Sequence, residues 1–271
     1  MIRYRNPFFK NLSLVRYFAL LFFTASLHAQ YPLLVYYGCT YDVKYFERYK
    51  TVVLDPDLYR DVHGLRSRSF AYLSLGEISN GRSYFNTVKK YQLIEGRNEE
   101  WGSHHIKISD KRWEHLLLTV VIPPIIEAGY TGLFLDTVDS LLARKIPNNE
   151  IVGLIKAIKK RYPTLKLMLN RGFEIADMVP IDALLYESTI SSYDFRSKKF
   201  SLFSYDFRFL PKQKIERYSV DYWNRDEPRE MAKIYKIALA KGYQPLVTDI
   251  SLNELPNVRL DVDKSRLEFD K

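Results

Sequence analysis

Carboxylic acids follow most of the short apolar runs in this sequence, at positions where they could act together. Leu133-Phe-Leu135 ends in Asp136, and Leu184-Leu-Tyr186 ends in Glu187. The polar residues found at such run ends are Asp55, Glu77, Asp136, Asn170, Glu187, Asp221 and Asp249. Any one of them could simply cap a turn. Six acids in one repeated position indicate a site instead, because like charges gathered without a use would repel one another.

Paired carboxyl groups are suited to cleaving glycosidic bonds, with one group ionised and the other protonated. Aromatic side chains, which can stack on sugar rings, make up 15% of the chain. The sequence contains no Gly-rich phosphate loop and no GxSxG nucleophile motif. The ends of the predicted strands also lack the lysine that a Schiff-base enzyme needs. The residue types therefore favour glycoside hydrolysis.

Eight apolar stretches are predicted to form the strands that carry these residues. Their continuous apolar character is typical of parallel strands that are buried on both faces. They are residues 33–38, 51–57, 70–77, 133–135, 165–172, 181–188, 217–222 and 245–249. Helices are expected at 43–49, 111–128, 148–161 and 228–240, with Pro123-Pro124 kinking the second. This alternation predicts a single (β/α)8 TIM barrel, in which the C-terminal strand ends converge on one face.

The first 29 residues have the pattern of a cleavable signal peptide. Four basic residues precede the apolar run 17–27, and a small residue, Ala29, stands before Gln30. The run is too short to span a bilayer comfortably. We therefore expect residues 1–29 to be removed and residues 30–271 to form one barrel domain. The mature protein is predicted to be secreted or periplasmic, with no membrane attachment.

Charge and cysteine content exclude several other classes of protein. The formal charge is +9, and the four basic residues of the signal segment account for part of it, which leaves about +5. Lys and Arg are scattered without a dense run, so nucleic acid is not a predicted partner. The single cysteine excludes a disulfide within the chain and any cysteine-based metal cluster.

Two segments do not fit the repeating pattern. The connection 78–110 is long and carries Trp101 and His104-His105, so we interpret it as a functional loop. The adjacent histidines would point to opposite sides of the backbone, which makes them a poor metal pair. The excursion 191–212 repeats Ser-Tyr-Asp-Phe-Arg and alternates aromatic with polar residues, which predicts a hairpin. Its aromatics either pack on the barrel rim or form a sugar-stacking wall beside Glu187.

Five short motifs follow one another along the chain. They are Ala71-Tyr-Leu-Ser-Leu-Gly-Glu77, Gly132-Leu-Phe-Leu-Asp-Thr-Val-Asp139, Asn170-Arg-Gly-Phe-Glu174, Tyr186-Glu-Ser188 and Val247-Thr-Asp249. In this order they resemble the bacterial branch of glycoside hydrolase family 114, the endo-α-1,4-polygalactosaminidase-like TIM barrels. The resemblance implies a retaining endo-hydrolase of α-1,4-linked galactosamine polymers that uses no cofactor and no metal. It places the two catalytic carboxyls on Asp136 and Glu187.

The same resemblance puts Asp55, Glu77, Asp139 and Asp249 at substrate-lining positions. Strand ends and the long connection add further candidate substrate-binding residues, namely Tyr37, Asn170, Arg171, Asp221 and Trp101. A polymer of unacetylated galactosamine is cationic, and such a partner would explain an acidic cleft in a basic protein.

By analogy with related barrels, Asp136 would be the nucleophile and Glu187 the general acid/base. We expect these side chains to face one another across the barrel mouth. Tyr186 and its apolar run are expected to favour protonated Glu187, and Arg171 to keep Asp136 ionised. Two alternatives remain open: a divalent-metal-dependent barrel enzyme, since acids at strand ends also bind Mg²⁺, and a non-catalytic glycan-binding barrel.

Overall fold

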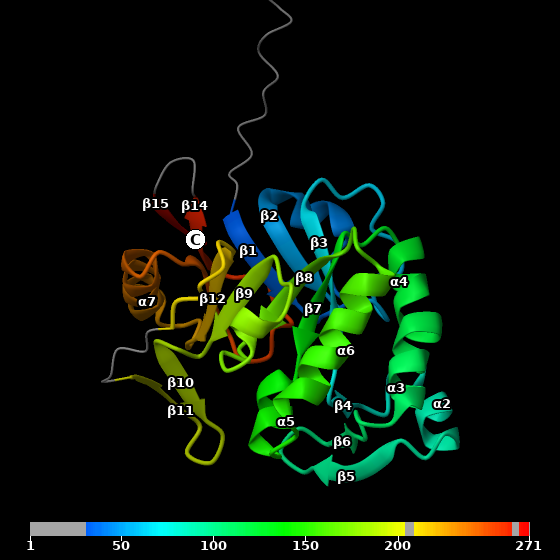
Figure 1. The fold of residues 1–271 in the computed structure, drawn as a ribbon. Helices are drawn as coiled ribbons and strands as arrows, with labels where there is room; N and C mark the ends of the chain where they lie inside the picture. The colour runs from blue at the N-terminus through cyan, green and yellow to red at the C-terminus, as the bar shows by residue number, and fades with distance from the viewer. Residues whose placement is uncertain (1–30, 204–208, 262–265, 271) are drawn as a thin grey trace, which may run out of the picture.

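Eight parallel strands form the centre of the computed structural model, which describes residues 31–203, 209–261 and 266–270. Their order in the sheet is β1-β2-β3-β7-β8-β9-β12-β13, and β1 lies beside β13, so the sheet curls into a nearly closed barrel (Figure 1). The predicted TIM-barrel fold is confirmed. The strands are Tyr31–Tyr36, Tyr49–Leu54, Arg68–Ser74, Gly132–Asp136, Lys166–Asn170, Ala183–Glu187, Glu216–Tyr222 and Gln244–Thr248, in that order.

Alternate residues of each strand enter two separate apolar clusters. One cluster fills the barrel interior and includes Val53, Phe134, Leu185 and Val220. The larger cluster lies between the strands and the outer layer of helices. Side chains of a strand alternate between its two faces, so a residue's place in this alternation decides whether it can reach the barrel mouth.

The helical layer is partly as predicted. Helices α6 (Asn148–Arg161) and α7 (Pro228–Ala240) have the predicted bounds. The expected helix 111–128 consists of α3 (Lys111–Leu116), a π-helical turn η2 (Leu117–Val121) and α4 (Ile122–Glu127). In η2 the amide of Ile122 donates to the carbonyl of Leu117, five residues earlier. The irregular turn directly precedes the two prolines, which lack the N–H groups of a regular helix.

Several other connections are not α-helices. The expected helix at 43–49 is a 3-10 helix, η1 (Val43–Arg48), and a second one, η3 (Ala176–Met178), lies between β8 and β9. A short α5 (Val138–Ala143) follows β7 directly. After β13 the chain forms a hairpin, β14 (Val258–Asp261) and β15 (Arg266–Phe269), which the sequence did not predict.

The long connection and the first part of the excursion, up to residue 202, both form regular structure at one end of the barrel. The connection forms α2 (Phe85–Lys90) and a three-stranded antiparallel sheet of β4 (Glu77–Ile78), β6 (Ser103–Ile106) and β5 (Ile94–Asn98). The predicted hairpin is β10 (Ser191–Asp194) and β11 (Lys199–Leu202). Both lie at the end toward which β7 runs (Figure 1).

Two sequence predictions fall on residues outside the described part of the chain. The segment 1–29, predicted to be a signal peptide, is one, and residues 204–208, the second copy of the repeat, are the other. Among the residues that the structure describes, no helix is long and apolar enough to span a membrane.

Candidate active site

Asp136 and Glu187 are brought together by an amide that lies between them. They end β7 and β9, and Asn170 ends the intervening strand β8. The Asn170 Nδ2 group donates to Asp136 Oδ1 at 2.8 Å and to Glu187 Oε2 at 2.7 Å. These two oxygens can be no farther apart than the two distances added together, 5.5 Å. The carboxyls are thus neighbours on one side of the mouth, one strand apart, and do not face each other across it.

Each of these three residues stands directly before a residue with positive φ. The φ angles are 64° at Thr137, 54° at Arg171 and 50° at Ser188. Positive φ is uncommon outside glycine and is a particular outlier for a β-branched residue such as threonine. The Thr137 hydroxyl compensates by accepting from the amide of Gly76 at 2.9 Å. Three strained turns at adjacent strand ends make the chain leave each strand abruptly, and such strain is typical of functional sites.

Two tyrosines that the sequence analysis did not single out complete the set of donors. The Tyr222 hydroxyl donates to Glu187 Oε1 at 2.6 Å, and the Tyr72 hydroxyl hydrogen-bonds to Asp136. The ring of Tyr37, a predicted site residue, meets that of Tyr72 edge-on at 5.2 Å. Tyr222 belongs to the interior cluster, and Tyr37 and Tyr72 pack against it. Counting alternate residues back from each strand end could have identified them.

The electrostatics of the pair differ from the expectation. Burial, together with the negative charge of Glu187, raises the pKa of Asp136 to about 6, against the lowering effect of Asn170. Arg171 does not contact Asp136, because its guanidinium pairs with Asp139 at 3.2 Å. Tyr186, adjacent to Glu187 in sequence, points to the other face of β9 and stacks on Tyr243 at 4.5 Å. The polar contacts of Glu187 come instead from the neighbouring strands.

Three of the predicted rim acids are each paired with an arginine. Asp55 Oδ1 lies 2.6 Å from the guanidinium of Arg82, which also sits 4.8 Å from the centre of the Tyr72 ring. Asp139 pairs with Arg171, as described, and Asp249 lies 3.4 Å from Arg225. These arginines offset the negative charge of the rim. The region of unpaired acidic groups is therefore smaller than the sequence indicated and centres on Asp136 and Glu187.

Glu77 and Asp221 do not line the mouth as predicted. Asp221 occupies the outward face of β12 between Val220 and Tyr222, is fully buried, and accepts from the amides of Ile190 and Ser191 at 2.8 and 2.9 Å. Burial raises the pKa of this carboxyl to about 6. Its role is to hold the loop after β9.

Glu77 lies beyond the end of β3, in the three-stranded sheet. It is buried and accepts from Ser103 Oγ at 2.5 Å, from the Ser140 hydroxyl and from Asn98. Burial alone would raise the pKa of this carboxyl, but the hydrogen bonds outweigh it and hold the pKa below its usual range. Through these hydrogen bonds the Glu77 carboxylate holds the 78–110 connection against the barrel. Trp101, at the β5–β6 turn, is in contrast 62% exposed.

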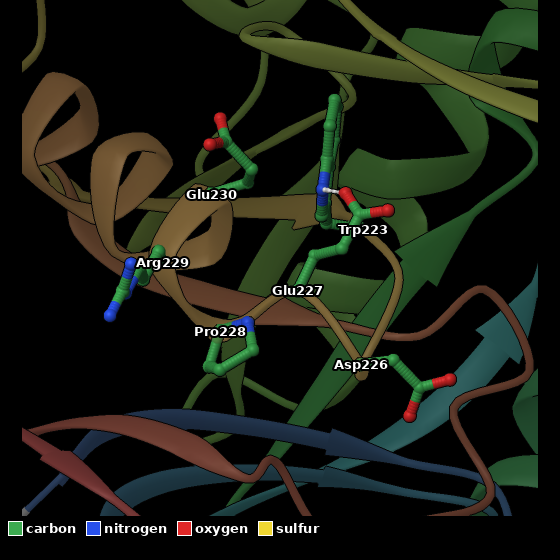
Figure 2. A pocket seen from close by; sticks show the side chains of 6 residues that line it. All are labelled: Trp223, Asp226, Glu227, Pro228, Arg229 and Glu230. Carbon is green, nitrogen blue, oxygen red and sulfur yellow. Dashed lines mark hydrogen bonds between the residues drawn. The ribbon is translucent and has the colours of Figure 1, made fainter.

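A cavity of about 640 Å³ opens near the site, at the beginning of α7. Figure 2 shows its lining, in which the Trp223 indole donates to Glu227 at 2.8 Å. Its other lining residues are Asp226, Pro228, Arg229 and Glu230. Neither central carboxyl lines it, although Trp223 directly follows Tyr222. Within the described residues, no group of three or more His, Cys, Asp or Glu side chains is arranged to hold a metal ion.

Comparison with known proteins identifies the family. The model of glycoside-hydrolase family GH114 matches residues 27–262. The chain belongs to this family. Membership makes it a glycoside hydrolase by descent and confirms the resemblance drawn from the five motifs. No curated protein sequence matches the chain.

Two solved structures share the barrel of this GH114 protein. The glycoside hydrolase domain of PelA from Pseudomonas aeruginosa has a TM-score of 0.71 at 21% identity, covering 85% of this chain and 98% of that one. Ega3 from Aspergillus fumigatus, solved in complex with galactosamine, has a TM-score of 0.58 at 10% identity. That match covers 90% of this chain and 95% of Ega3. At these identities the likeness establishes the fold.

Proposed function

We propose that this protein is an exported, retaining endo-hydrolase that cleaves α-1,4-linked galactosamine polymers at Asp136 and Glu187. The observation that carries the proposal is the Asn170 amide, which binds both carboxyls and keeps the bonded oxygens within 5.5 Å of each other. Carboxyls about 5–5.5 Å apart are typical of retaining enzymes. Inverting enzymes need about 6.5–9.5 Å to admit a water molecule between catalyst and sugar.

In the first step Asp136 attacks the anomeric carbon while Glu187 gives its proton to the departing glycosidic oxygen. The bond to the leaving sugar breaks as the glycosyl–Asp136 ester forms. In the second step Glu187 takes a proton from a water molecule, whose oxygen displaces Asp136 from the same carbon. Both displacements invert the centre, so the product has the original configuration.

The contacts of Asp136 suit the nucleophilic role. With a pKa of about 6 it is ionised at neutral pH. Its hydrogen bonds with Asn170 and Tyr72 favour the ionised form. The Tyr222 hydroxyl and the same Asn170 amide hold both oxygens of Glu187, which fixes the direction in which this carboxyl points.

Family membership and the galactosamine bound to Ega3 support the choice of substrate. The charge of the rim supports it less, since three of its acids are paired with arginines. The test therefore compares a galactosamine polymer with its N-acetylated form, reading new reducing ends and the anomer that appears first by NMR. We expect cleavage of the free-amine polymer with retention. Cleavage of neither polymer would contradict the substrate, and first release of the inverted anomer would contradict the mechanism.

The same assay separates the alternatives. Activity that a chelator abolishes would indicate the metal-dependent enzyme, and polymer that is bound but never cut would indicate the glycan-binding barrel. Export is tested separately. Mass spectrometry of the protein recovered from its native cell is expected to find a new N-terminus near Gln30 or Tyr31.

A further inference from the structure

The tips of the two excursions meet in an exposed aromatic contact. Trp101 comes from the β5–β6 turn and Phe195 from the β10–β11 hairpin, and their ring centroids are 5.3 Å apart at 81°. Trp101 is 62% exposed and Phe195 is 44% exposed, whereas the other two tryptophans are buried or nearly so. A contact made only to join the excursions would gain more by burying these rings.

Both tips are held rigidly by polar groups. The side-chain oxygen Oδ1 of Asn98 accepts from the backbone amides of Glu100 and Trp101, at 3.2 and 3.4 Å, while its Nδ2 group donates to the buried Glu77 carboxylate. In the hairpin, Asp194 Oδ1 accepts from the amide of Arg196 at 2.8 Å. The buried Glu77 carboxylate thus holds Asn98 in place, and Asn98 in turn holds the turn that carries Trp101. A ligand that stacks on the two rings would meet them already in place, which lowers the entropy lost on binding.

The rings form one end of an aromatic row that runs along the hairpin to Trp223, which Phe200 meets at 5.6 Å. Phe195 meets Tyr193 at 5.0 Å, and Tyr193 meets Phe200 at 4.7 Å. Phe200 packs against the interior cluster of the barrel, as Tyr37 and Tyr72 do. The row therefore connects the exposed pair with Trp223, which directly follows Tyr222, the residue whose hydroxyl donates to Glu187.

We propose that Trp101 and Phe195 form a distal subsite that binds a sugar ring of the polysaccharide several units from the scissile bond. This inference rests on the proposed glycosidase function and adds the residues that let the protein prefer long chains. The apolar C–H face of a pyranose ring suits the exposed face of Trp101, and the ammonium group of an amino sugar adds a cation–π attraction.

The test measures cleavage of galactosamine oligomers of graded length by Trp101→Ala, Trp101→Phe and Phe195→Ala proteins. Phe269→Ala is the matched control, because Phe269 is 50% exposed on β15, whose Glu268 contacts Tyr31 at the opposite end of the barrel. We expect KM for the longest oligomers to rise about tenfold in Trp101→Ala, with kcat and KM for the shortest cleaved oligomer unchanged. KM for the longest oligomers should rise less in Trp101→Phe and should not change in Phe269→Ala.

Binding of polysaccharides to the Glu187→Gln protein, with and without Trp101→Ala, separates this inference from the proposed function. Weaker binding of any polysaccharide upon loss of Trp101 supports the subsite even where no galactosamine polymer is cut. A lower Tm with unchanged affinity at every chain length would overturn it, since the rings would then serve only to join the excursions. An equal effect on short and long oligomers would also overturn it, as would the absence of binding to every polysaccharide.

Discussion

Glu187 is the last residue of β9 and Asp221 the second-last of the neighbouring β12, yet they belong to different environments. In the register of β9 and β12, Glu187 pairs with Val220, so Asp221 lies one residue farther along and points the opposite way. Glu187 enters the barrel mouth and accepts from Tyr222 and Asn170. Asp221 faces outward and binds backbone amides of the loop that follows Glu187. A shift of one residue thus separates a group available to substrate from a group that holds a loop.

Replacing each of the two inward acids, and one outward acid as the control, would sharpen this comparison most strongly. Asp136→Asn is expected to abolish cleavage of every substrate, because the glycosyl ester cannot form. Glu187→Gln is expected to retain turnover of activated aryl glycosides, and added azide should yield a glycosyl azide of retained configuration. Asp221→Asn, the outward control, should keep its activity. If azide instead rescued Asp136→Asn with an inverted product and did not rescue Glu187→Gln, then Glu187 would be the nucleophile and Asp136 the general acid/base.

The pH dependence of the rate reports the coupling between the two inward acids. Because the pKa of Asp136 is raised to about 6, kcat/KM should fall about tenfold for each pH unit below that value, as the nucleophile becomes protonated. The Glu187 carboxylate raises this pKa when it is ionised, and Glu187→Gln removes that contribution at every pH. With an activated aryl glycoside as substrate, the acidic limb of this variant should move to lower pH. An unmoved limb would mean that Asp136 does not control it.

The outward acid should instead affect stability. The pKa of Asp221 in the folded protein, about 6, exceeds its ordinary value of 3.8, so the folded state binds this proton more tightly. The resulting stability is fully present below pH 3.8 and is lost as the pH rises through about 6. Asp221→Asn cannot ionise and keeps an acceptor, so its Tm should exceed that of the wild type by roughly 5 °C at pH 7.5. The difference should vanish near pH 4, and a constant difference would contradict the assignment.

The sequence was sufficient for the barrel, and the five motifs shared with the family singled out Asp136 and Glu187 among the acids at its strand ends. Short continuous apolar runs are typical of strands in a parallel sheet covered on both faces, and eight of them in one domain-sized chain favour a barrel. The C-terminal ends of parallel strands then share one face. Because β7, β8 and β9 are neighbours in the barrel, the ends of these strands place Asp136, Asn170 and Glu187 on the same side of the mouth.

Only the tertiary structure decided which polar residues serve that site. The alternation of side chains set Glu77 and Asp221 apart from the mouth, and the sequence alone did not give the strand register on which this depends. Arginines distant in sequence, such as Arg82 for Asp55, offset the rim charge through contacts that no local pattern predicts. Tyr222 and Tyr72 became hydrogen-bond donors because their strands bring them next to Glu187 and Asp136. Local sequence determines which groups are present, and packing between distant segments determines which of them meet.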